Sequence, residues 1–507
     1  MTMIEWGMSA MSHDAALAVM VDNEIVYASH GERYSRIKND KNLHPAQIQE
    51  ALEYGEPSRV HFYENTWLKK WRQLRAGQYN LLTKQSPQSY LKSLGIAASF
   101  KMHPHHTSHA AYALYTDPDR APETDILVID SIGESETLSI WKGGYFAHTA
   151  DNLVKVWSQS YPHSVGLWYS AMTQRLGLKP QEHEYILMGM AALGDPNRYR
   201  QTLLDDFILK MPTTDDPSIL FKQNLHRGCQ WWRPEITSVQ DYVDIAAAVQ
   251  KIYEEIFVGL LAFMKTYSTA KRVAIVGGCA LNCVANTLAY NFYDSVWVPP
   301  NPGDAGSAIG AILSGTRRRA PLLTPYLGTN IVGEYPIQAI LNDLQQWGVA
   351  AVASGRAEYG PRALGHRSLL ADPRLPDIKD RVNRIKHREE FRPFSPMVLS
   401  EHAANHFRLP DVNFSAPYMQ YAIPCLHPQT FPGIVHIDDT SRVQTVSKAM
   451  PWEDRGPRRL LEAWHGITGC PMLLNTSLNI KGEPLVNTRE DADRWTAQHG
   501  VTVRTAT

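Results

Sequence analysis

The stretch KRVAIVGG, residues 271–278, decides the fold class. A short apolar strand runs directly into two glycines, and a helical pattern follows. DSVWVPP (294–300) is a second such strand, which ends in a proline-rich loop that leads into a helical pattern. TDILVID (124–130) is a third apolar strand, and the turn-forming residues Ser-Ile-Gly follow it. Strands that feed helices through such loops predict an α/β fold, with ligands bound at the carboxyl ends of the strands.

Turn-forming segments divide the rest of the chain. Residues 13–34 contain two strand-like runs on either side of an Asp-Asn pair, which predicts an opening hairpin. The basic, turn-rich stretch GTRRRAPLLTPYLG (315–328) indicates a domain boundary, because a second periodic block begins after it. We expect a first domain over residues 1–325 and a second over residues 326–507, and two domains suit a chain of 507 residues.

The composition excludes several classes of protein. The 50 lysine and arginine residues balance 51 aspartate and glutamate residues, so no overall charge draws the chain to nucleic acid or to an anionic membrane. The five cysteines are odd in number and lack CxxC spacing, which favours a reducing compartment over a disulfide framework. No apolar run approaches a membrane span, and the first residues lack the features of a signal peptide. We therefore expect a soluble, cytoplasmic protein.

The segment HPHHTSHAAY (103–112) is rich in histidine. If it is helical, His105 and His109 lie on one face, at a spacing that lets two imidazoles bind one ion. Carboxylates at strand ends are the expected further ligands, and the candidates are Asp130 after ILVI and Asp304 in NPGDAGSAIG. The alternative is an amphipathic helix whose imidazoles are solvated or hydrogen-bonded. The residues alone leave both interpretations open.

Two glycine-rich loops offer a place for a phosphate group. VGGCALNC (276–283) and NPGDAGSAIG (301–310) each lead into a helix, whose free N–H groups and dipole favour an anion. Such loops are also ordinary tight turns. Cys279 and Cys283 could ligate a metal, although small packed side chains are their commoner role. The candidate nucleotide-binding residues are Gly277, Gly278, Asn282, Gly303 and Gly306.

Further stretches carry a resemblance that covers nearly the whole chain. In the first domain they are SHDAA, GERYSRIKND, HHTSHAA, VIDSIGE, GLWYSAMTQRLG, HEYILMGMAALG, GGCALNC and NPGDAGSAIGA. In the second they are GRAEYGPRALGHRSLLADPR, KHREEFRPFSP, SRVQTV and LLNTSLNIKGEPLV. In these motifs and in their order the chain resembles the nodulation-type O-carbamoyltransferases. The resemblance implies an actin-like ATPase domain, similar to the tRNA threonylcarbamoyl-transfer proteins, followed by a YrdC-like domain.

The resemblance also implies a reaction in two stages. The second domain would join carbamoyl phosphate and ATP into carbamoyl-adenylate, and the first would transfer the carbamoyl group to an acceptor hydroxyl. A divalent metal, iron foremost, is expected on His105, His109, Asp130 and Asp304, with Mg²⁺ accompanying ATP. Arginines suit the phosphates because they make forked contacts. The residues expected to bind carbamoyl phosphate and ATP are Arg356, Arg362, Arg367, Lys386, Arg388, Arg392, Ser395, Arg442, Asn475, Thr476, Ser477 and Lys481.

His13, beside Asp14 in SHDAA, is the candidate for orienting or deprotonating the acceptor hydroxyl, because imidazole titrates near neutral pH. A hydrogen-bonded structural turn is the alternative role for this pair. Three positions of the chain depart from the family's pattern. Ser131 stands where glycine is usual, Ile186 where a basic residue is common, and His366 where asparagine is more usual.

The segment from Asn65 to Thr116 contains no acidic residue, while lysines and arginines alternate with aromatic residues such as Trp67 and Trp71. Basic side chains with aromatic platforms are typical of nucleic-acid-binding surfaces. A solvated helical face over an aromatic core is the alternative. The candidate contacts to nucleic acid are Lys69, Lys70, Arg72 and Arg75.

The acceptor follows from two hints, this segment and GERYSRIKND, which looks more like phage and marine members of the family. We expect a hydroxymethylated pyrimidine, with 5-hydroxymethylcytosine in DNA or as a nucleotide as the preferred acceptor. The alternatives are a hydroxyl of a small molecule (an antibiotic, a sugar or a nodulation factor), tRNA threonylcarbamoyl transfer, and a non-enzymatic ATP-binding scaffold. The oligomeric state stays open, with a homodimer as one expectation.

Overall fold

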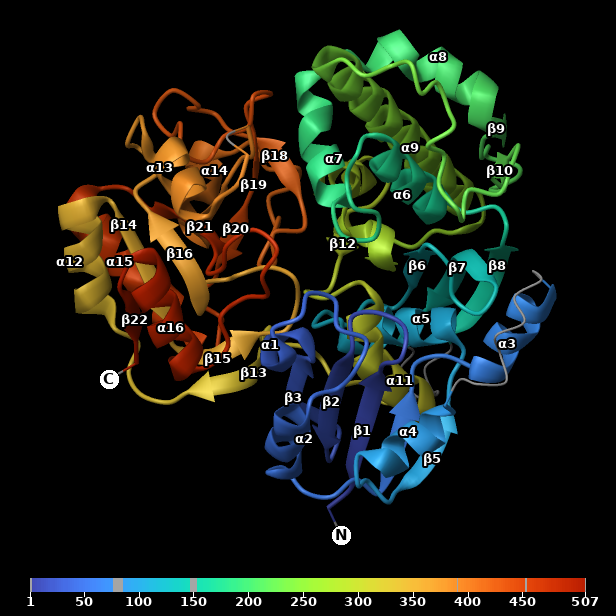
Figure 1. Ribbon diagram of the computed structural model, residues 1–507, viewed down its shortest axis with the longest axis horizontal. Coiled ribbons are helices and arrows are strands. Elements are labelled where there is room, and N and C mark those ends of the chain that lie inside the picture. The colour runs from blue at the N-terminus through green and yellow to red at the C-terminus, as the bar shows by residue number, and fades with distance from the viewer. Residues whose placement is uncertain (1, 76–84, 146–152, 390, 452–453, 507) are drawn as a thin grey trace. The chain divides into compact units, whose positions relative to one another are not determined.

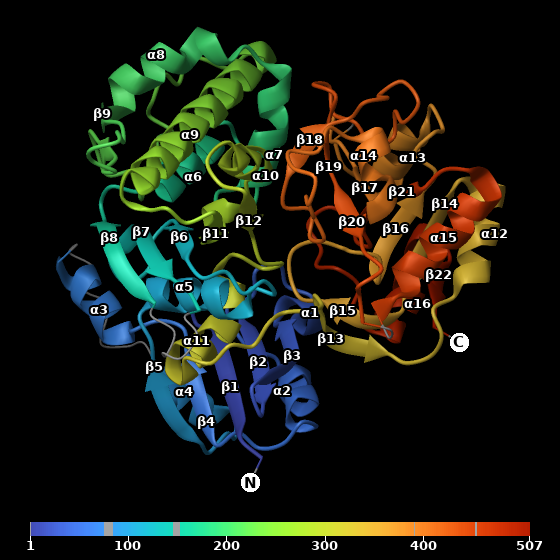
Figure 2. The ribbon, with the colours of Figure 1, turned by 180° about the vertical axis from the view of Figure 1, so that it is seen from behind.

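The computed structural model describes residues 2–75, 85–145, 153–389, 391–451 and 454–506, apart from the side chain of residue 75. The chain forms two compact units, the middle unit, Val60–Arg319, and the terminal unit, which joins Met1–Arg59 to Ala320–Thr507. Figures 1 and 2 show the elements of both units from opposite sides. The fold is mixed α/β, which confirms the predicted class.

The middle unit is built on a five-stranded sheet in the order β12-β11-β6-β7-β8. β11 pairs in parallel with β6 and with β12, whereas β7 pairs antiparallel with β6 and β8. Every side chain of β6 and β11 is buried, as expected for strands covered on both faces. The strands are Thr124–Ile129 (β6), Glu136–Gly143 (β7), Val154–Ser160 (β8), Arg272–Val276 (β11) and Ser295–Trp297 (β12).

Two helices of the middle unit, α5 (His105–Thr116) and α11 (Ser307–Thr316), pack closely against each other. A side chain on Gly310 would meet the main-chain oxygen of Ser108 at 2.0 Å, so glycine is required for this approach. α5 is buried along almost its whole length. Its histidines are therefore interior side chains, and the solvated alternative is wrong for this helix.

The remaining elements of the middle unit surround these. They are β4 (Arg59–Phe62), α3 (Thr66–Arg75), α4 (Pro87–Ser93), β5 (Ser99–Met102), α6 (Val165–Arg175), α7 (Glu184–Met190), η1 (Ala191–Leu193), α8 (Pro196–Phe207), β9 (Ile208–Lys210), β10 (Leu220–Phe221), α9 (Val239–Tyr267), η2 (Gly278–Leu281), α10 (Cys283–Thr287), η3 (Leu288–Asn291) and η4 (Asp304–Gly306).

The terminal unit contains a six-stranded sheet in the order β20-β17-β21-β16-β14-β22. The β14–β22 and β17–β20 pairs are parallel, and the other pairs are antiparallel. The strands are Val349–Ala353 (β14), Arg367–Ala371 (β16), Ser395–Leu399 (β17), Gln444–Val446 (β20), Met472–Ser477 (β21) and Val503–Thr505 (β22).

The first 59 residues group with the C-terminal part of the chain because polar side chains tie them together. Arg33 donates to the main-chain oxygen of Gly360, and Arg36 donates to those of Pro484 and Leu485. The functional division into residues 1–325 and 326–507 stays a prediction. The expected hairpin is present, with β2 and β3 joined through an Asp-Asn turn at φ of 47° and 73°.

The other elements of the terminal unit are β1 (Ile4–Ser9), β2 (Ala16–Val21), β3 (Glu24–His30), α1 (Glu32–Ser35), α2 (Pro45–Leu52), β13 (Tyr326–Ile331), α12 (Ile337–Trp347), β15 (Gly355–Glu358), α13 (Ile378–Ile385), η5 (Ser400–His402), α14 (Ala403–His406), β18 (Ala422–Pro424), β19 (Thr440–Arg442), α15 (Gly456–Thr468) and α16 (Arg489–His499). Within the described ranges, no helix has both the length and the apolar composition needed to cross a bilayer.

Candidate metal centre and anion site

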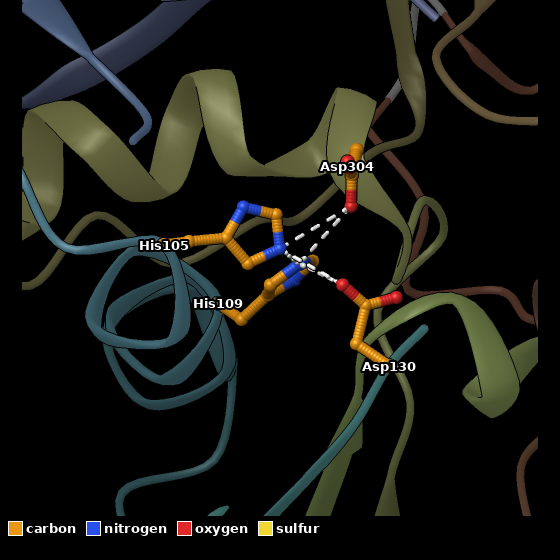
Figure 3. A group of neighbouring side chains, drawn as sticks. All are labelled: His105, His109, Asp130 and Asp304. Carbon is orange, nitrogen blue, oxygen red and sulfur yellow. Dashed lines mark hydrogen bonds and ion pairs between the residues drawn. The ribbon is translucent and has the colours of Figure 1, made fainter. Parts of the chain in front are cut away.

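Four side chains of the middle unit converge on one point (Figure 3): His105, His109, Asp130 and Asp304. The Nε2 atom of His105 lies 2.9 Å from Asp130 Oδ2 and 3.5 Å from Asp304 Oδ1. The Nε2 atom of His109 lies 3.1 Å from that of His105 and 3.4 Å from Asp304 Oδ1. The structure therefore brings together all four side chains that the sequence nominated.

The elements explain this convergence. The two histidines lie one helical turn apart on α5, Asp130 follows the last residue of β6, and Asp304 opens η4 after β12. β6 and β12 both pair in parallel with β11, so their carboxyl ends lie at the same edge of the sheet. The main-chain N–H of Gly278, beyond the end of β11, donates to Asp130 Oδ1 at 3.1 Å and fixes this carboxylate.

Charge at this cluster favours a cation. Burial alone would lower the pKa of His105, but the carboxylates of Asp304 and Asp130 raise it to about 10. Burial would raise the pKa of Asp130, whereas His105 holds it well below its usual range. Two carboxylates thus share an interior site that needs positive charge.

The donor set fits a transition metal. Two imidazoles and two carboxylates are ligands that zinc, iron and manganese accept. Ligand atoms at about 2.0–2.2 Å from one ion lie roughly 3–3.5 Å from each other, and the four donor atoms here lie within 4.8 Å of one another. Cys279 and Cys283 are outside this group, which is the one such group among the described residues.

Two of the five predicted nucleotide-binding residues border open space beside the cluster. A side chain on Gly278 would meet only Asp130 Oδ1, at 3.1 Å, and one on Gly303 would meet only the Gly278 Cα, at 4.0 Å. Their main chains are therefore accessible to a ligand that lies next to Asp130.

The other three have packing roles. A side chain on Gly277 would lie 2.2 Å from the oxygen of Ile129, and one on Gly306 would lie 1.9 Å from that of Asn301. Asn282 caps α10, where its side chain accepts from the N–H of Ala285. These residues shape the loops, and their part in nucleotide binding stays a prediction.

His13 and Asp14 belong to the terminal unit. The Nδ1 atom of His13 lies 3.2 Å from Asp14 Oδ2, and the two side chains are 41% and 33% exposed. Asp14 adopts a φ of 50°, a left-handed conformation that aspartate tolerates in turns. The geometry thus contains the predicted His–Asp contact, with the imidazole open to solvent.

A group of cations lies on the loop after α13 in the terminal unit. Lys386 is buried, and its Nζ donates to Ser477 and to the main-chain and side-chain oxygens of Asn479 at 2.9 and 3.0 Å. Burial and the neighbouring Arg388 and Arg392 hold the pKa of Lys386 well below its usual range. Positive charges that raise each other's energy in this way favour an anion among them.

Strand register places further predicted phosphate-binding residues on neighbouring strands of the six-stranded sheet. Ser395 on β17 lies opposite Asn475 on β21, and the Nε of Arg442 donates to the Ser395 hydroxyl at 3.2 Å. The Asn475 side chain donates to the main-chain oxygen of Ala363, in the loop that carries Arg362. Thr476, next on β21, lies opposite Leu369, and Lys481 forms an ion pair with Glu389.

Two predicted arginines are engaged elsewhere. Arg367 is fully buried, and its guanidinium donates to main-chain oxygens of Thr329, Ser354, Gly355, His366 and Asn487. Arg356 likewise donates to the main-chain oxygens of Val26 and Leu327. These bonds hold loops together, and they engage all three nitrogens of the buried Arg367 guanidinium.

The predicted nucleic-acid contacts on α3 differ in direction. Lys69 turns toward the protein and pairs with Glu64 at 2.8 Å, and Arg72 donates to the oxygen of Gly133 at 3.4 Å. The side chain of Arg75 lies outside the described residues. Two of the four cations are thus committed to internal contacts.

The outward face of α3 is apolar. Trp67, Leu68, Trp71 and Leu74 are 70%, 51%, 57% and 45% exposed. Lys70 lies beside this face, with its ammonium 5.4 Å from the Trp67 ring. The aromatic platforms expected from the sequence are therefore accessible, and their neighbour Lys70 supplies a cation.

Sequence reasoning missed three residues with defined contacts. Glu134 accepts from the N–H of His105, Glu358 accepts from three N–H groups of the 364–367 loop, and Asn479 binds Lys386. Each lies within a stretch that the sequence singled out: VIDSIGE, GRAEYG and LLNTSLN. The available signal was a polar side chain next to a predicted ligand.

Comparisons with known proteins agree with this geometry. Residues 58–313 match the family model "Carbamoyltransferase N-terminus", and residues 341–505 match "Carbamoyltransferase C-terminus". An uncharacterized protein from Synechocystis sp. is 31% identical over 96% of this chain and 93% of its own length. Nodulation protein NolNO from Sinorhizobium fredii is 30% identical over 95% of this chain and 76% of its own length.

A ROK hexokinase from Thermus thermophilus covers 62% of this chain and 98% of its own, at 12% identity and a TM-score of 0.26, which is too low to support an argument. The two family models, by contrast, match in order along most of the chain. The chain therefore belongs to the carbamoyltransferase family and is an O-carbamoyltransferase.

Proposed function

We propose that this enzyme makes carbamoyl-adenylate from carbamoyl phosphate and ATP and transfers the carbamoyl group to an acceptor hydroxyl. The observation that carries the proposal is the buried cluster of His105, His109, Asp130 and Asp304, whose charge balance favours a cation. The cations around Lys386 in the terminal unit support a separate site for phosphorylated substrates.

The first stage belongs to the terminal unit in this proposal. Water cleaves carbamoyl phosphate to carbamate and phosphate. A carbamate oxygen then attacks the α-phosphorus of ATP, and pyrophosphate leaves. Arg388, Arg392 and Arg442 bind the phosphate groups, because guanidinium groups pair with phosphate oxygens in a forked geometry. Lys386 donates to Ser477 and Asn479 and so fixes their positions.

The second stage uses the four-residue cluster of the middle unit, within the predicted transfer domain of residues 1–325. The acceptor oxygen attacks the carbamoyl carbon, and AMP leaves with the electrons of the broken C–O bond. A divalent metal held by the four ligands, iron by resemblance, would supply Lewis-acid charge for the departing phosphate. The main chains of Gly278 and Gly303 border the space beside Asp130 and would accommodate the adenylate. His13, oriented by Asp14, is the proposed acceptor of the hydroxyl proton.

The preferred acceptor is 5-hydroxymethylcytosine, in DNA or as a nucleotide. Its support is the outward face of α3, where Trp67 and Trp71 offer stacking surfaces and Lys70 a cation. A base within a duplex would have to be flipped out, at a cost of a few kcal/mol. The preference also rests on the absence of aspartate and glutamate from the sequence between Asn65 and Thr116.

A small-molecule hydroxyl is the second candidate acceptor. Lys69 and Arg72 turn toward the protein, which reduces the number of phosphate contacts available on α3. Several relatives, moreover, carry the name nodulation protein. Such an acceptor would need no basic surface.

The acceptor is tested by mass spectrometry of a synthetic oligonucleotide with one 5-hydroxymethylcytosine. The oligonucleotide is incubated with the protein, ATP, carbamoyl phosphate and Fe²⁺ or Mn²⁺. We expect a gain of one carbamoyl group that requires ATP, and no gain on a matched oligonucleotide with unmodified cytosine. An unchanged mass together with conversion of ATP to AMP and pyrophosphate would contradict the DNA acceptor and favour small-molecule hydroxyls.

A further inference from the structure

Glu134 is a buried carboxylate that the reaction above does not use. It is 4% exposed and lies in the loop between β6 and β7, the loop that also carries the ligand Asp130. Its Oε1 accepts from the main-chain N–H of His105 at 2.9 Å and from that of Asn65 at 2.5 Å, and its Oε2 lies 3.1 Å from the same His105 nitrogen. Glu134 is not one of the four converging donors.

This contact replaces a cap that α5 lacks. The residue before the helix is Pro104, and no side chain at that position bonds to the first N–H groups. Unsatisfied N–H groups at a helix start carry partial positive charge, which a carboxylate stabilises. Glu134 supplies that carboxylate from another element, and it does so at His105, the first residue of the helix.

The second ring nitrogen of His105, Nδ1, bears on how the ring is held in place. A metal-ligating imidazole is usually oriented by a hydrogen bond to its second ring nitrogen. In the described part of the chain, the Nδ1 of His105 has no such partner. The ring is instead fixed through its main chain and by packing, because a side chain on Gly133 would lie 2.9 Å from the ring.

We propose that Glu134 is a positioning residue of the metal centre: by bonding the main chain of His105, it holds this ligand at the place where the four donors meet. The inference rests on the metal centre of the proposed function. The same carboxylate also holds Asn65, directly before α3, and Arg72 of that helix donates to Gly133 in the same loop. One loop thus provides a ligand, orients a second ligand and anchors the start of α3.

The test measures metal binding without turnover. Metal-free protein is titrated with Co²⁺, and the affinity and the visible absorption spectrum are recorded. Loss of a group that orients a ligand costs about 10–100-fold in metal affinity, so we expect Glu134→Ala, which removes both acceptor oxygens, to bind Co²⁺ about 10–100-fold more weakly, with an altered spectrum. Glu134→Asp keeps a carboxylate and should fall between this variant and the wild type.

Glu64→Ala is the matched control. Glu64 is also 4% exposed and binds Lys69 on α3, so its replacement perturbs the same region without removing the bond to His105. We expect wild-type affinity and spectrum for this variant. Equal Co²⁺ binding by the wild type and Glu134→Ala, or an equal loss in Glu64→Ala, would overturn the positioning role while the metal centre stands.

Two further results complete the test. Failure of the wild type itself to bind Co²⁺ would overturn the metal centre, and the positioning role with it. If Glu134→Ala does not fold, Glu134→Asp decides the question, because a wild-type spectrum and affinity in that variant would contradict a requirement for the carboxylate at its present reach.

Discussion

The guanidinium of Arg367 stabilises the terminal unit by donating to main-chain oxygens from four separate segments, at residues 329, 354–355, 366 and 487. Burial lowers its pKa to about 10, against an opposing contribution from the Glu358 carboxylate. Arg367→Met would remove the donor to these oxygens and the positive charge that offsets the buried Glu358 carboxylate. Removal of one partner from a buried charged pair costs about 3–5 kcal/mol.

We therefore expect Arg367→Met to lower the free energy of unfolding by about 3–5 kcal/mol, measured by urea denaturation. Arg384→Ala, on the exposed side of α13, is the control and should change it by less than about 0.5 kcal/mol. A variant as stable as the wild type that no longer releases pyrophosphate would instead make Arg367 a substrate ligand.

His366 makes the stability of the terminal unit depend on pH. Burial lowers the pKa of His366 to about 4, against an opposing contribution from Glu358, and its ring stacks on Tyr326 at 3.7 Å. Between pH 6.5 and 4 the unfolded chain binds a proton at this residue and the folded chain does not. Stability is therefore lost as the pH falls through this range.

His366→Asn should remove that dependence, which amounts to at most about 1.4 kcal/mol per pH unit. The measurement is urea unfolding of both proteins at pH 5 and pH 7, with the exposed His427→Asn as control. The difference between the two pH values should shrink in His366→Asn alone. An unchanged difference would show that His366 is protonated at pH 5 in the folded chain.

At the scale of single residues, the sequence predicted which four side chains lie together, but it did not predict what each buried arginine contacts. It nominated His105, His109, Asp130 and Asp304 correctly as neighbours because helical spacing and strand ends define where such side chains point. It also nominated Arg367 as a phosphate ligand, whereas the guanidinium donates to main-chain oxygens of distant loops. A sequence does not reveal which of these groups an arginine faces.

Tight turns after the strands set the geometry of the elements around the metal cluster. Gly277 has a φ of +92°, and a Cβ there would lie 2.2 Å from the oxygen of Ile129, which ends β6. The next residue, Gly278, bonds to Asp130. Any shift of this turn therefore disturbs the hydrogen bond that fixes Asp130, a proposed metal ligand.

Gly277→Ala is expected to weaken Co²⁺ binding at least tenfold and to lower the thermal midpoint, because both the backbone conformation and the close contact disfavour alanine. Gly177→Ala is the control, since Gly177 has a φ of +76° and no atom within 4 Å of its would-be Cβ. Its loss should be limited to the backbone strain. An equal loss in both variants would show that the contact with Ile129 has no influence on the metal centre.

Element type was predictable where local pattern determines it. The hydrophobic runs of β6 and β11 and the Asp-Asn hairpin between β2 and β3 appear as expected. The orientation of α3 was not predictable, because its outward face is apolar and its lysine and arginine side chains partly face the protein. Amphipathic patterns identify two faces of a helix without identifying which one is buried.

The whole molecule combines a buried cluster of two histidines and two aspartates in the middle unit with a cluster of basic side chains in the terminal unit. The grouping of the first 59 residues with the C-terminal part could not be predicted from sequence, because it rests on hydrogen bonds such as that from Arg33 to Gly360, which join distant segments. The two-stage reaction predicts that damage to each cluster affects a different product.

The most direct test of the account measures pyrophosphate release and carbamoylated acceptor for wild type, His109→Ala and Arg362→Ala. We predict that His109→Ala releases pyrophosphate from ATP and carbamoyl phosphate but forms no carbamoylated product, because it removes a metal ligand of the transfer site. Arg362→Ala should lose both products, because it removes a charge at the adenylate-forming site. Loss of pyrophosphate release in His109→Ala, in a protein that remains folded, would contradict the division into two sites.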